Sequence, residues 1–269
     1  MNKNILGLLA LLTFATVFTN CSKDEEDLSG VGSIAFEFDN RAGDASLVFG
    51  NEYKNAAGET LKFSTFNYFV SNFVLVKADG SEYVVPKDSC YFLCKHDDPD
   101  SREVVINNIP AGDYEEIRFT IGVDSAKSVS DISQRTGVLD PASGASGMYW
   151  AWNSGYIFVK VEGTSPQAPL DPMLGENIFQ YHTGLYGGLT SPTLNNIKTV
   201  TLHSHDEPAK VRRDHEAPTV HTYVDVLEMF TSPTNISVAV NPTSHAGPYS
   251  KTVADNYADM FKLAHIHNH

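Results

Sequence analysis

The alternation of apolar and polar side chains constrains the fold of this chain more than any other feature of its sequence. Between Gly32 and Phe38 every second residue is large and apolar, which places Ile34, Phe36 and Phe38 on one face of an extended segment. A period of two residues is typical of a half-buried strand, whereas a helix repeats every 3.6 residues. The segment Gly32–Phe38 is therefore predicted to be a half-buried strand, which indicates a β protein.

The same pattern continues along the chain. Val74–Lys77 and Glu82–Val85 flank Asp79-Gly80, a hairpin signal in which both turn residues tolerate positive φ. Further strands are predicted at Val104–Ile106, Glu116–Ile121, Tyr156–Glu162, Ile197–His203, Thr222–Leu227 and Asn235–Val240. Helical periodicity occurs only at Ala254–Leu263. We predict a mainly β fold: one antiparallel β-sandwich-like domain over residues 32–269, with long loops and a short C-terminal helix.

Residues 1–20 have the pattern of an export signal. Lys3 precedes the apolar run Ile5–Phe18, which at roughly 14 residues is shorter than the ~20 that a membrane span needs. The run ends at Cys21, and the acidic stretch Asp24–Asp27 follows almost at once. This arrangement resembles a bacterial lipoprotein signal, in which the cysteine is lipid-modified and becomes the mature N-terminus. The alternative is a plain secretory signal with a free Cys21.

We therefore expect a signal peptide over residues 1–20, lipidation at Cys21 and an acidic flexible tether over residues 21–31. The protein is expected to be an outer-membrane lipoprotein of a Gram-negative bacterium, either periplasmic or surface-exposed. Its formal charge of -14 argues against nucleic-acid binding, which requires clustered Lys and Arg. Membrane attachment is accordingly expected through lipid and not through basic side chains.

Besides Cys21, the candidate for lipidation, the chain has two cysteines. Cys90 and Cys94 flank the strand-like Tyr91–Leu93, and four residues along a strand span ~13 Å, more than the ~4.4–6.8 Å between Cα atoms that a disulfide tolerates. An oxidising compartment favours pairing, and a turn or bulge would allow it. The sequence does not decide whether Cys90 and Cys94 form a disulfide.

A long irregular segment, Asp124–Ser154, contains both tryptophans of the protein, Trp150 and Trp152. Loops of this length inside a compact domain are usually functional or disordered, and the aromatic content argues against disorder. The simpler interpretation is that both indoles pack over a sheet.

The chain resembles the MbnP-like copper-binding proteins, named for methanobactin gene clusters. The resemblance covers residues 32–262 and is carried, in the family's order, by Phe66–Leu75, Asp79-Gly80, Ile109–Tyr114, Ile121–Asp124, Leu139–Pro141, Gly147–Tyr156, Glu162-Gly163, His182-x-Gly184 and Ser244-His245. It implies a secreted or lipidated protein with a di-haem peroxidase-like partner. In characterised members that partner oxidises a tryptophan to kynurenine, and copper binding depends on the change.

Indole has no in-plane lone pair and is not a metal ligand, but opening its ring frees an arylamine nitrogen that can be one. Beside neutral imidazoles this nitrogen would make a site suited to copper. The resulting hypothesis is that His182 and His245 are ligands and that Trp150 or Trp152 is the modified residue. An outer-membrane transporter is a further expected partner.

Other histidines form a second candidate site. His203-x-His205 would point to one face at a strand end, although solvation there is the simpler interpretation. The terminal His265, His267 and His269 would bind Cu(II) or Zn(II) loosely or fray.

The sequence leaves two other function classes open. A binding or adhesion module would dock a glycan or a protein through the aromatic loop. An enzyme is not expected, because neither Gly-x-Ser-x-Gly nor His-Glu-x-x-His occurs and no carboxylate pair is singled out by its surroundings.

Overall fold

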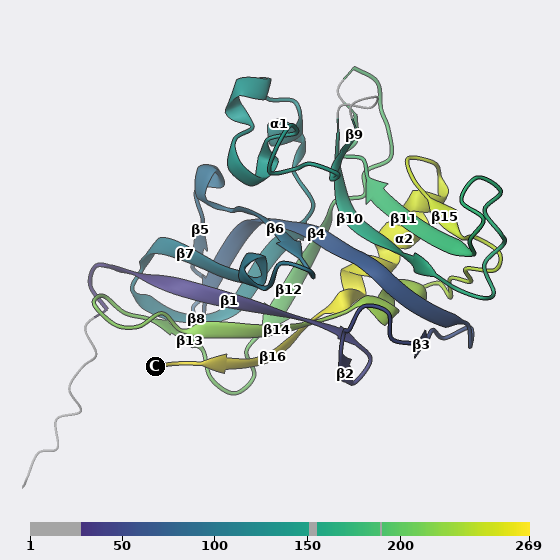
Figure 1. The fold of residues 1–269 in the computed structure, drawn as a ribbon. Coiled ribbons are helices and arrows are strands. Elements are labelled where there is room, and N and C mark those ends of the chain that lie inside the picture. Colours follow the sequence, from purple (N-terminus) through teal and green to yellow (C-terminus); the bar gives the residue numbers. More distant parts are fainter. Residues whose placement is uncertain (1–27, 151–154, 189) are drawn as a thin grey trace, which may run out of the picture.

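The computed structural model describes residues 28–150, 155–188 and 190–269. Within them the strands form two sheets, one of five strands and one of eleven, which curl into a half-barrel around a shared core (Figure 1). This confirms the mainly β prediction. The helices of the described residues are all too short or too polar to cross a membrane.

The smaller sheet is built on the first predicted strand. Its members are β16 (Phe261–His267), β14 (Thr219–Asp225), β1 (Val31–Ala42), β2 (Ala45–Ser46) and β7 (Glu103–Pro110). β1 pairs in parallel with β14 and antiparallel with β7. The alternation seen in the sequence is confirmed, because Ile34, Phe36 and Phe38 are buried while the residues between them are half-buried.

The larger sheet follows the order β12-β8-β4-β10-β11-β15, with short strands added at its edges. The main members are β12 (Lys198–His203), β8 (Gly112–Ile121), β4 (Thr60–Lys77), β10 (Gly155–Thr164), β11 (Ile178–Gly184) and β15 (Thr243–Ser244). The added strands are β3 (Tyr53–Lys54), β5 (Glu82–Val84), β6 (Tyr91–Lys95), β9 (Tyr149–Trp150) and β13 (Ala209–Val211). Pairing is antiparallel except between β11 and β15 here and between β1 and β14 in the smaller sheet.

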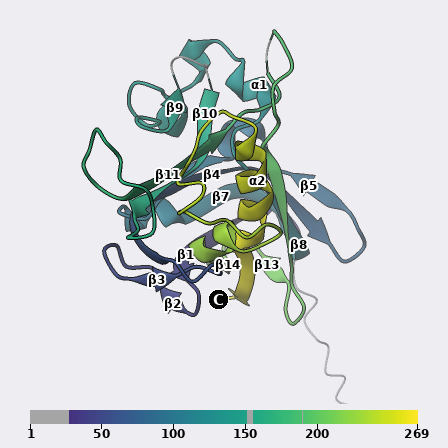
Figure 2. The same ribbon diagram turned by 90° about the vertical axis from the view of Figure 1, so that its right-hand side faces the viewer.

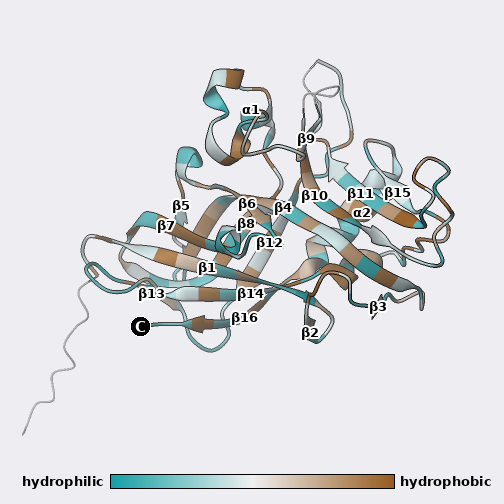
Figure 3. Ribbon diagram, in the orientation of Figure 1, coloured by the Kyte–Doolittle hydropathy of each residue, from teal (hydrophilic) through white to brown (hydrophobic). Residues whose placement is uncertain are grey.

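Aromatic side chains from both sheets fill the space between them. Phe38 of β1 packs edge to face against Phe119 of β8, with ring centroids 6.0 Å apart. Phe261 of β16 packs against the same Phe119 ring, with centroids 5.4 Å apart. Apolar and polar residues are interspersed along the strands, as expected for sheets with one buried face (Figure 3).

The segment from Asp124 to Trp150 is folded, although it contains little regular structure. It has one turn of α-helix, α1 (Ser125–Ser128), and the 3₁₀ turns η3 (Ile132–Gln134) and η4 (Gly137–Leu139). Its apolar residues form a second, smaller core with β10 and β4. In Figure 1 this segment stands above the sheets.

Two predicted elements were wrong in extent or type. The predicted helix Ala254–Leu263 is instead α2 (Tyr249–Tyr257), which faces the viewer in Figure 2, followed by the 3₁₀ turn η6 (Ala258–Met260). From Phe261 to His267 the chain satisfies its backbone groups by pairing with β14, so this segment forms the strand β16. The remaining 3₁₀ turns are η1 (Lys87–Ser89), η2 (Pro99–Arg102) and η5 (Val226–Phe230).

The predicted strand Asn235–Val240 is a turn segment. Ile236 and Val238 are buried, as its alternation indicated. The backbone N–H groups of Val238 and Ala239 donate hydrogen bonds to the carboxylate of Glu59 and not to a neighbouring strand. A side chain thus replaces the strand partner that the pattern predicted.

Candidate metal centre

His182 lies in the middle of β11, and its side chain is 16% exposed. Across the β10–β11 pair it is opposite Lys160. Glu162 lies two residues further along β10 and therefore faces the same side of the sheet. Strand pairing alone thus places a carboxylate and an ammonium group beside the imidazole.

Glu162 orients the His182 ring. Its Oε1 is 2.6 Å from His182 Nε2, and its Oε2 accepts a hydrogen bond from Thr65 Oγ1 at 2.8 Å. The hydrogen bond from His182 lowers the pKa of Glu162 to about 2, and although burial opposes this, Thr65 and Lys160 add to it. Because a carboxylate only accepts hydrogen bonds, Nε2 is the donor and a neutral His182 carries its lone pair on Nδ1.

β15 brings His245 next to His182. The two residues before His245 pair in parallel with the two before His182, so the histidines follow side by side. Their ring centroids are 4.8 Å apart, with the planes at 64°. Burial, and then the neighbouring His182, lowers the pKa of His245 below its ordinary 6.5, against the influence of Glu162. His245 is therefore neutral at pH 7, with a lone pair available to a metal.

Trp150 packs against Gly184 at the end of β11. Its side chain is 7% exposed, which confirms the packing interpretation for this tryptophan. A Cβ atom at Gly184 would lie 3.0 Å from Trp150 Cζ3 and 2.2 Å from the carbonyl oxygen of Tyr156. His182-x-Gly184 therefore combines a candidate ligand with the glycine that admits the indole.

The other predicted tryptophan, Trp152, lies outside the described residues. Docking through the aromatic loop is disfavoured by the part that is described. Trp150 is buried, and Tyr156 is fully buried and donates a hydrogen bond to the Leu139 carbonyl oxygen at 2.7 Å. Tyr149 is half-buried and packs against Tyr156. Among the described residues of the loop, these rings pack against one another and present little aromatic surface.

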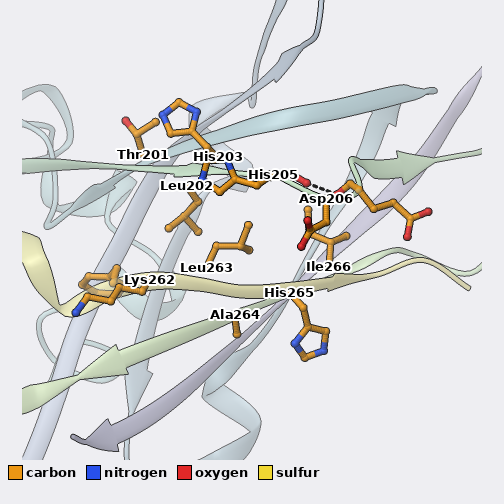
Figure 4. Close-up of a pocket in the computed structure, with 13 residues that line it drawn as sticks. Thr201, Leu202, His203, His205, Asp206, Lys262, Leu263, Ala264, His265 and Ile266 are labelled. Atoms are coloured by element: carbon orange, nitrogen blue, oxygen red, sulfur yellow. Dashed lines mark hydrogen bonds between the residues drawn. The ribbon is translucent and has the colours of Figure 1, made fainter. Parts of the chain in front are cut away.

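The second candidate set is divided between the two sheets. His203 ends β12 and contacts Glu116, with Nδ1 3.2 Å from Oε2, while His205 lies beyond the strand. His265 is on β16, and in Figure 4 its ring and that of His203 point away from each other on opposite sides of a pocket. His267 and His269 follow His265, with their ring centroids 4.3 Å apart. The five histidines therefore do not form one site.

The cysteines show no sign of metal binding. Cys90 and Cys94 are free, buried thiols. Burial raises the pKa of both, so they stay protonated and are not thiolate ligands. Cys90 directly precedes β6 and Cys94 lies within it, so the extended residues Tyr91–Leu93 separate the two thiols, which is the geometry that opposed a disulfide. Cys21 lies outside the described residues.

Within the described ranges, no three His, Cys, Asp or Glu side chains converge as a ready-made metal site. His182 and His245 supply two imidazoles, which fit copper in donor type but leave its coordination incomplete. The residue that sequence reasoning missed is Glu162, whose role depends on cross-strand register. Its only signal in the sequence was its place in the Glu162-Gly163 element.

Comparisons with known proteins place these features in a family. A search of curated proteins found no match. Among solved structures, MbnP from Methylosinus trichosporium is similar at 16% identity, covering 81% of this chain and 82% of its own, with a TM-score of 0.49. The family model for MbnP matches residues 31–247. Because that match spans most of the chain, the protein belongs to the MbnP family, a methanobactin-associated and copper-related group.

Proposed function

We propose that this protein is a copper-binding lipoprotein of the cell envelope that acquires or handles copper and is not an enzyme. His182 and His245 are the protein's own ligands, and an oxidised tryptophan, Trp150 or Trp152, supplies a third nitrogen. A di-haem peroxidase-like protein carries out the oxidation, and an outer-membrane transporter is a further partner. The observation that carries the proposal is the contact between the two histidines, with ring centroids 4.8 Å apart.

Three features of the centre favour this function. The pKa of His245 is lowered, so its imidazole is not protonated at neutral pH. His182 is held by a carboxylate, the arrangement in which metal-binding histidines are commonly oriented. Two imidazoles alone make a weak site, which is consistent with a requirement for one more ligand before copper is held tightly.

The oxidation supplies that ligand by opening the indole ring. One oxygen atom adds to C2 and one to C3 of the indole as the bond between these carbons breaks, and two molecules of the peroxide used by the partner are consumed, with two molecules of water released. Hydrolysis then releases formate and leaves kynurenine, whose arylamine nitrogen has a lone pair. The indole of Trp150 packs against Gly184, two residues from His182 on β11, which supports Trp150 as the residue whose opened ring joins the imidazoles.

The test is a Cu(I) titration of untagged protein, produced together with the oxidising partner, in competition with a chromophoric chelator. We expect His182→Ala and His245→Ala each to abolish tight binding, while His215→Ala, a change at an exposed loop histidine, leaves it unchanged. Unchanged stoichiometry in both ligand variants would contradict the proposal.

The same titration separates the contribution of the tryptophan. Protein produced without the oxidising partner should bind Cu(I) weakly, and co-production should tighten binding. A peptide map should then show the mass change of kynurenine on the peptide that carries Trp150 and Trp152. Tight binding by protein with both indoles intact would refute this part.

A further inference from the structure

The outer face of the smaller sheet carries a row of carboxylates and imidazoles. Strand register aligns Glu103 of β7 with Glu37 of β1, Glu37 with His221 of β14, and His221 with His265 of β16. None of these side chains belongs to the core, because the alternating residues of β1 face inward. Four neighbouring strands thus present two acids followed by two histidines.

The two histidines are in direct contact. Their ring centroids are 4.2 Å apart and the planes are within 15° of parallel. Residues directly opposite in an antiparallel pair have Cβ atoms ~4.5–5.5 Å apart, a spacing from which two imidazoles can reach one ion. His265 is exposed, so its ring can turn toward the ion without losing buried contacts.

Glu37 prepares His221 for this role. Its Oε2 lies 2.8 Å from His221 Nδ1. Since the carboxylate accepts, Nδ1 is the donor and a neutral His221 carries its lone pair on Nε2. Metal-binding histidines are commonly held in this way, by a carboxylate on the nitrogen that does not bind. The pair Glu37–His221 therefore repeats the arrangement of Glu162 and His182 on the other sheet.

The surroundings favour a cation. A pocket next to His221 has Glu37, Glu103, His267 and His269 among its lining residues. His269 Nδ1 lies 3.9 Å from Glu216 Oε2, which adds a third carboxylate to this end of the sheet. Imidazole ligands with acidic neighbours suit Cu(II), Ni(II) and Zn(II).

We propose that His221 and His265 form a second transition-metal site, which takes a divalent ion and needs no oxidised tryptophan. Water completes the coordination, because within the described residues no third donor side chain already converges there. Such a site is weak and exchangeable, and it suits transient capture of a metal ion. His265, one of the two ligands, lies outside residues 31–247, the part of the chain matched by the family model.

The two sites use different sheets and disjoint residues. His182 and His245 come from β11 and the end of β15, whereas His221 and His265 come from β14 and β16 (Figure 1). Failure of either proposal would leave the other intact, because each is tested by its own variants.

The experiment uses the untagged full chain, produced without the oxidising partner, with Cu(II) as the probe. Isothermal titration should detect one ion per chain at this site, and electron paramagnetic resonance should show two nitrogen ligands. We expect His221→Ala or His265→Ala to weaken binding at least ~10-fold and Glu37→Gln to weaken it by about 10-fold. Thermal unfolding in the absence of metal should show that the variants remain folded.

The matched control is His203→Ala, which removes another strand histidine that contacts a glutamate. It should bind Cu(II) like the wild type. The proposal is overturned if His221→Ala and His265→Ala bind like the wild type, if the control loses binding equally, or if the loss occurs only in His267→Ala and His269→Ala.

Discussion

Glu162 connects the candidate metal centre to the rest of the larger sheet. It holds His182 through a 2.6 Å contact and is itself held by Thr65. Replacing it by glutamine keeps the size but weakens the acceptor, so His182 would be less well oriented and less basic. We predict that Glu162→Gln weakens Cu(I) affinity about 10- to 100-fold, the usual range for loss of such a partner. Competition titration with the oxidised protein measures the change.

A second histidine–glutamate pair offers the control. Glu116 lies 3.2 Å from His203, outside the proposed centre. Glu116→Gln should leave Cu(I) affinity unchanged, which separates a local effect from a general loss of negative charge. Equal affinities for wild type and Glu162→Gln would show that the carboxylate does not support the ligand.

For single residues, the sequence identified candidate metal ligands but not the side chains that contact them. His182 and His245 came from the family resemblance, and the structure places them in contact. Glu162 and Glu37 could not be assigned to their histidines, because both contacts depend on cross-strand register. His221 directly precedes the predicted strand Thr222–Leu227, and nothing in its local sequence indicates that His265 is opposite.

Among the elements, the segment Asn235–Val240 shows how a correct pattern can give a wrong structure. Its alternation buries Ile236 and Val238, as a strand would. Glu59 then accepts hydrogen bonds from Ser237 Oγ at 2.6 Å, Val238 N at 2.8 Å and Ala239 N at 3.0 Å. A carboxylate distant in sequence satisfies the backbone here, and single-sequence periodicity contains no information about it. The C-terminal helix was misplaced for a similar reason, since β16 forms on β14.

Glu59 should therefore stabilise the segment that leads to β15 and His245. In Glu59→Gln an amide NH₂ would face backbone N–H donors, leaving buried donors unpaired. We predict that the free energy of unfolding falls by about 1–3 kcal/mol, measured by urea denaturation at pH 7. Glu52→Gln is the control, because Glu52 is 65% exposed and pairs only with Lys62 among the described residues.

The pH dependence of stability gives the same prediction a second readout. Burial raises the pKa of Glu59, but hydrogen bonds from Ser237, Ala239, Asn55 and Val238 outweigh it, so the native pKa lies below the ordinary 4.5. A lowered native pKa means that the contribution is complete above pH 4.5 and is lost as pH falls through the native value. Between pH 5 and 3 the wild type should lose stability more steeply than Glu59→Gln. Parallel curves would rule out this role.

For the whole molecule, charge and attachment act together. The formal charge is -14, and removal of residues 1–20 with Lys3 would make the mature chain more acidic. An acidic surface raises the local concentration of cations, which favours both proposed metal sites. β1 begins at Val31, so a tether over residues 21–31 would keep the domain within roughly 35 Å of the membrane. Lipidation at Cys21 would thus fix the place of metal capture without changing the sites.

That separation of attachment from binding can be tested with one substitution. Cys21→Ser removes the thiol to which lipid would be joined, so we predict that the variant moves from the detergent phase to the aqueous phase after phase separation of a Gram-negative host extract. Its Cu(I) and Cu(II) affinities should equal those of the wild type, because both candidate centres lie in the sheets. Cys90→Ser is the matched control, since Cys90 is a buried thiol inside the fold and should leave partitioning unchanged. If Cys21→Ser stayed in the detergent phase, the lipid-anchor hypothesis would be wrong. Residues 1–20 would then be a plain secretory signal, and the protein would be attached to the membrane by other means.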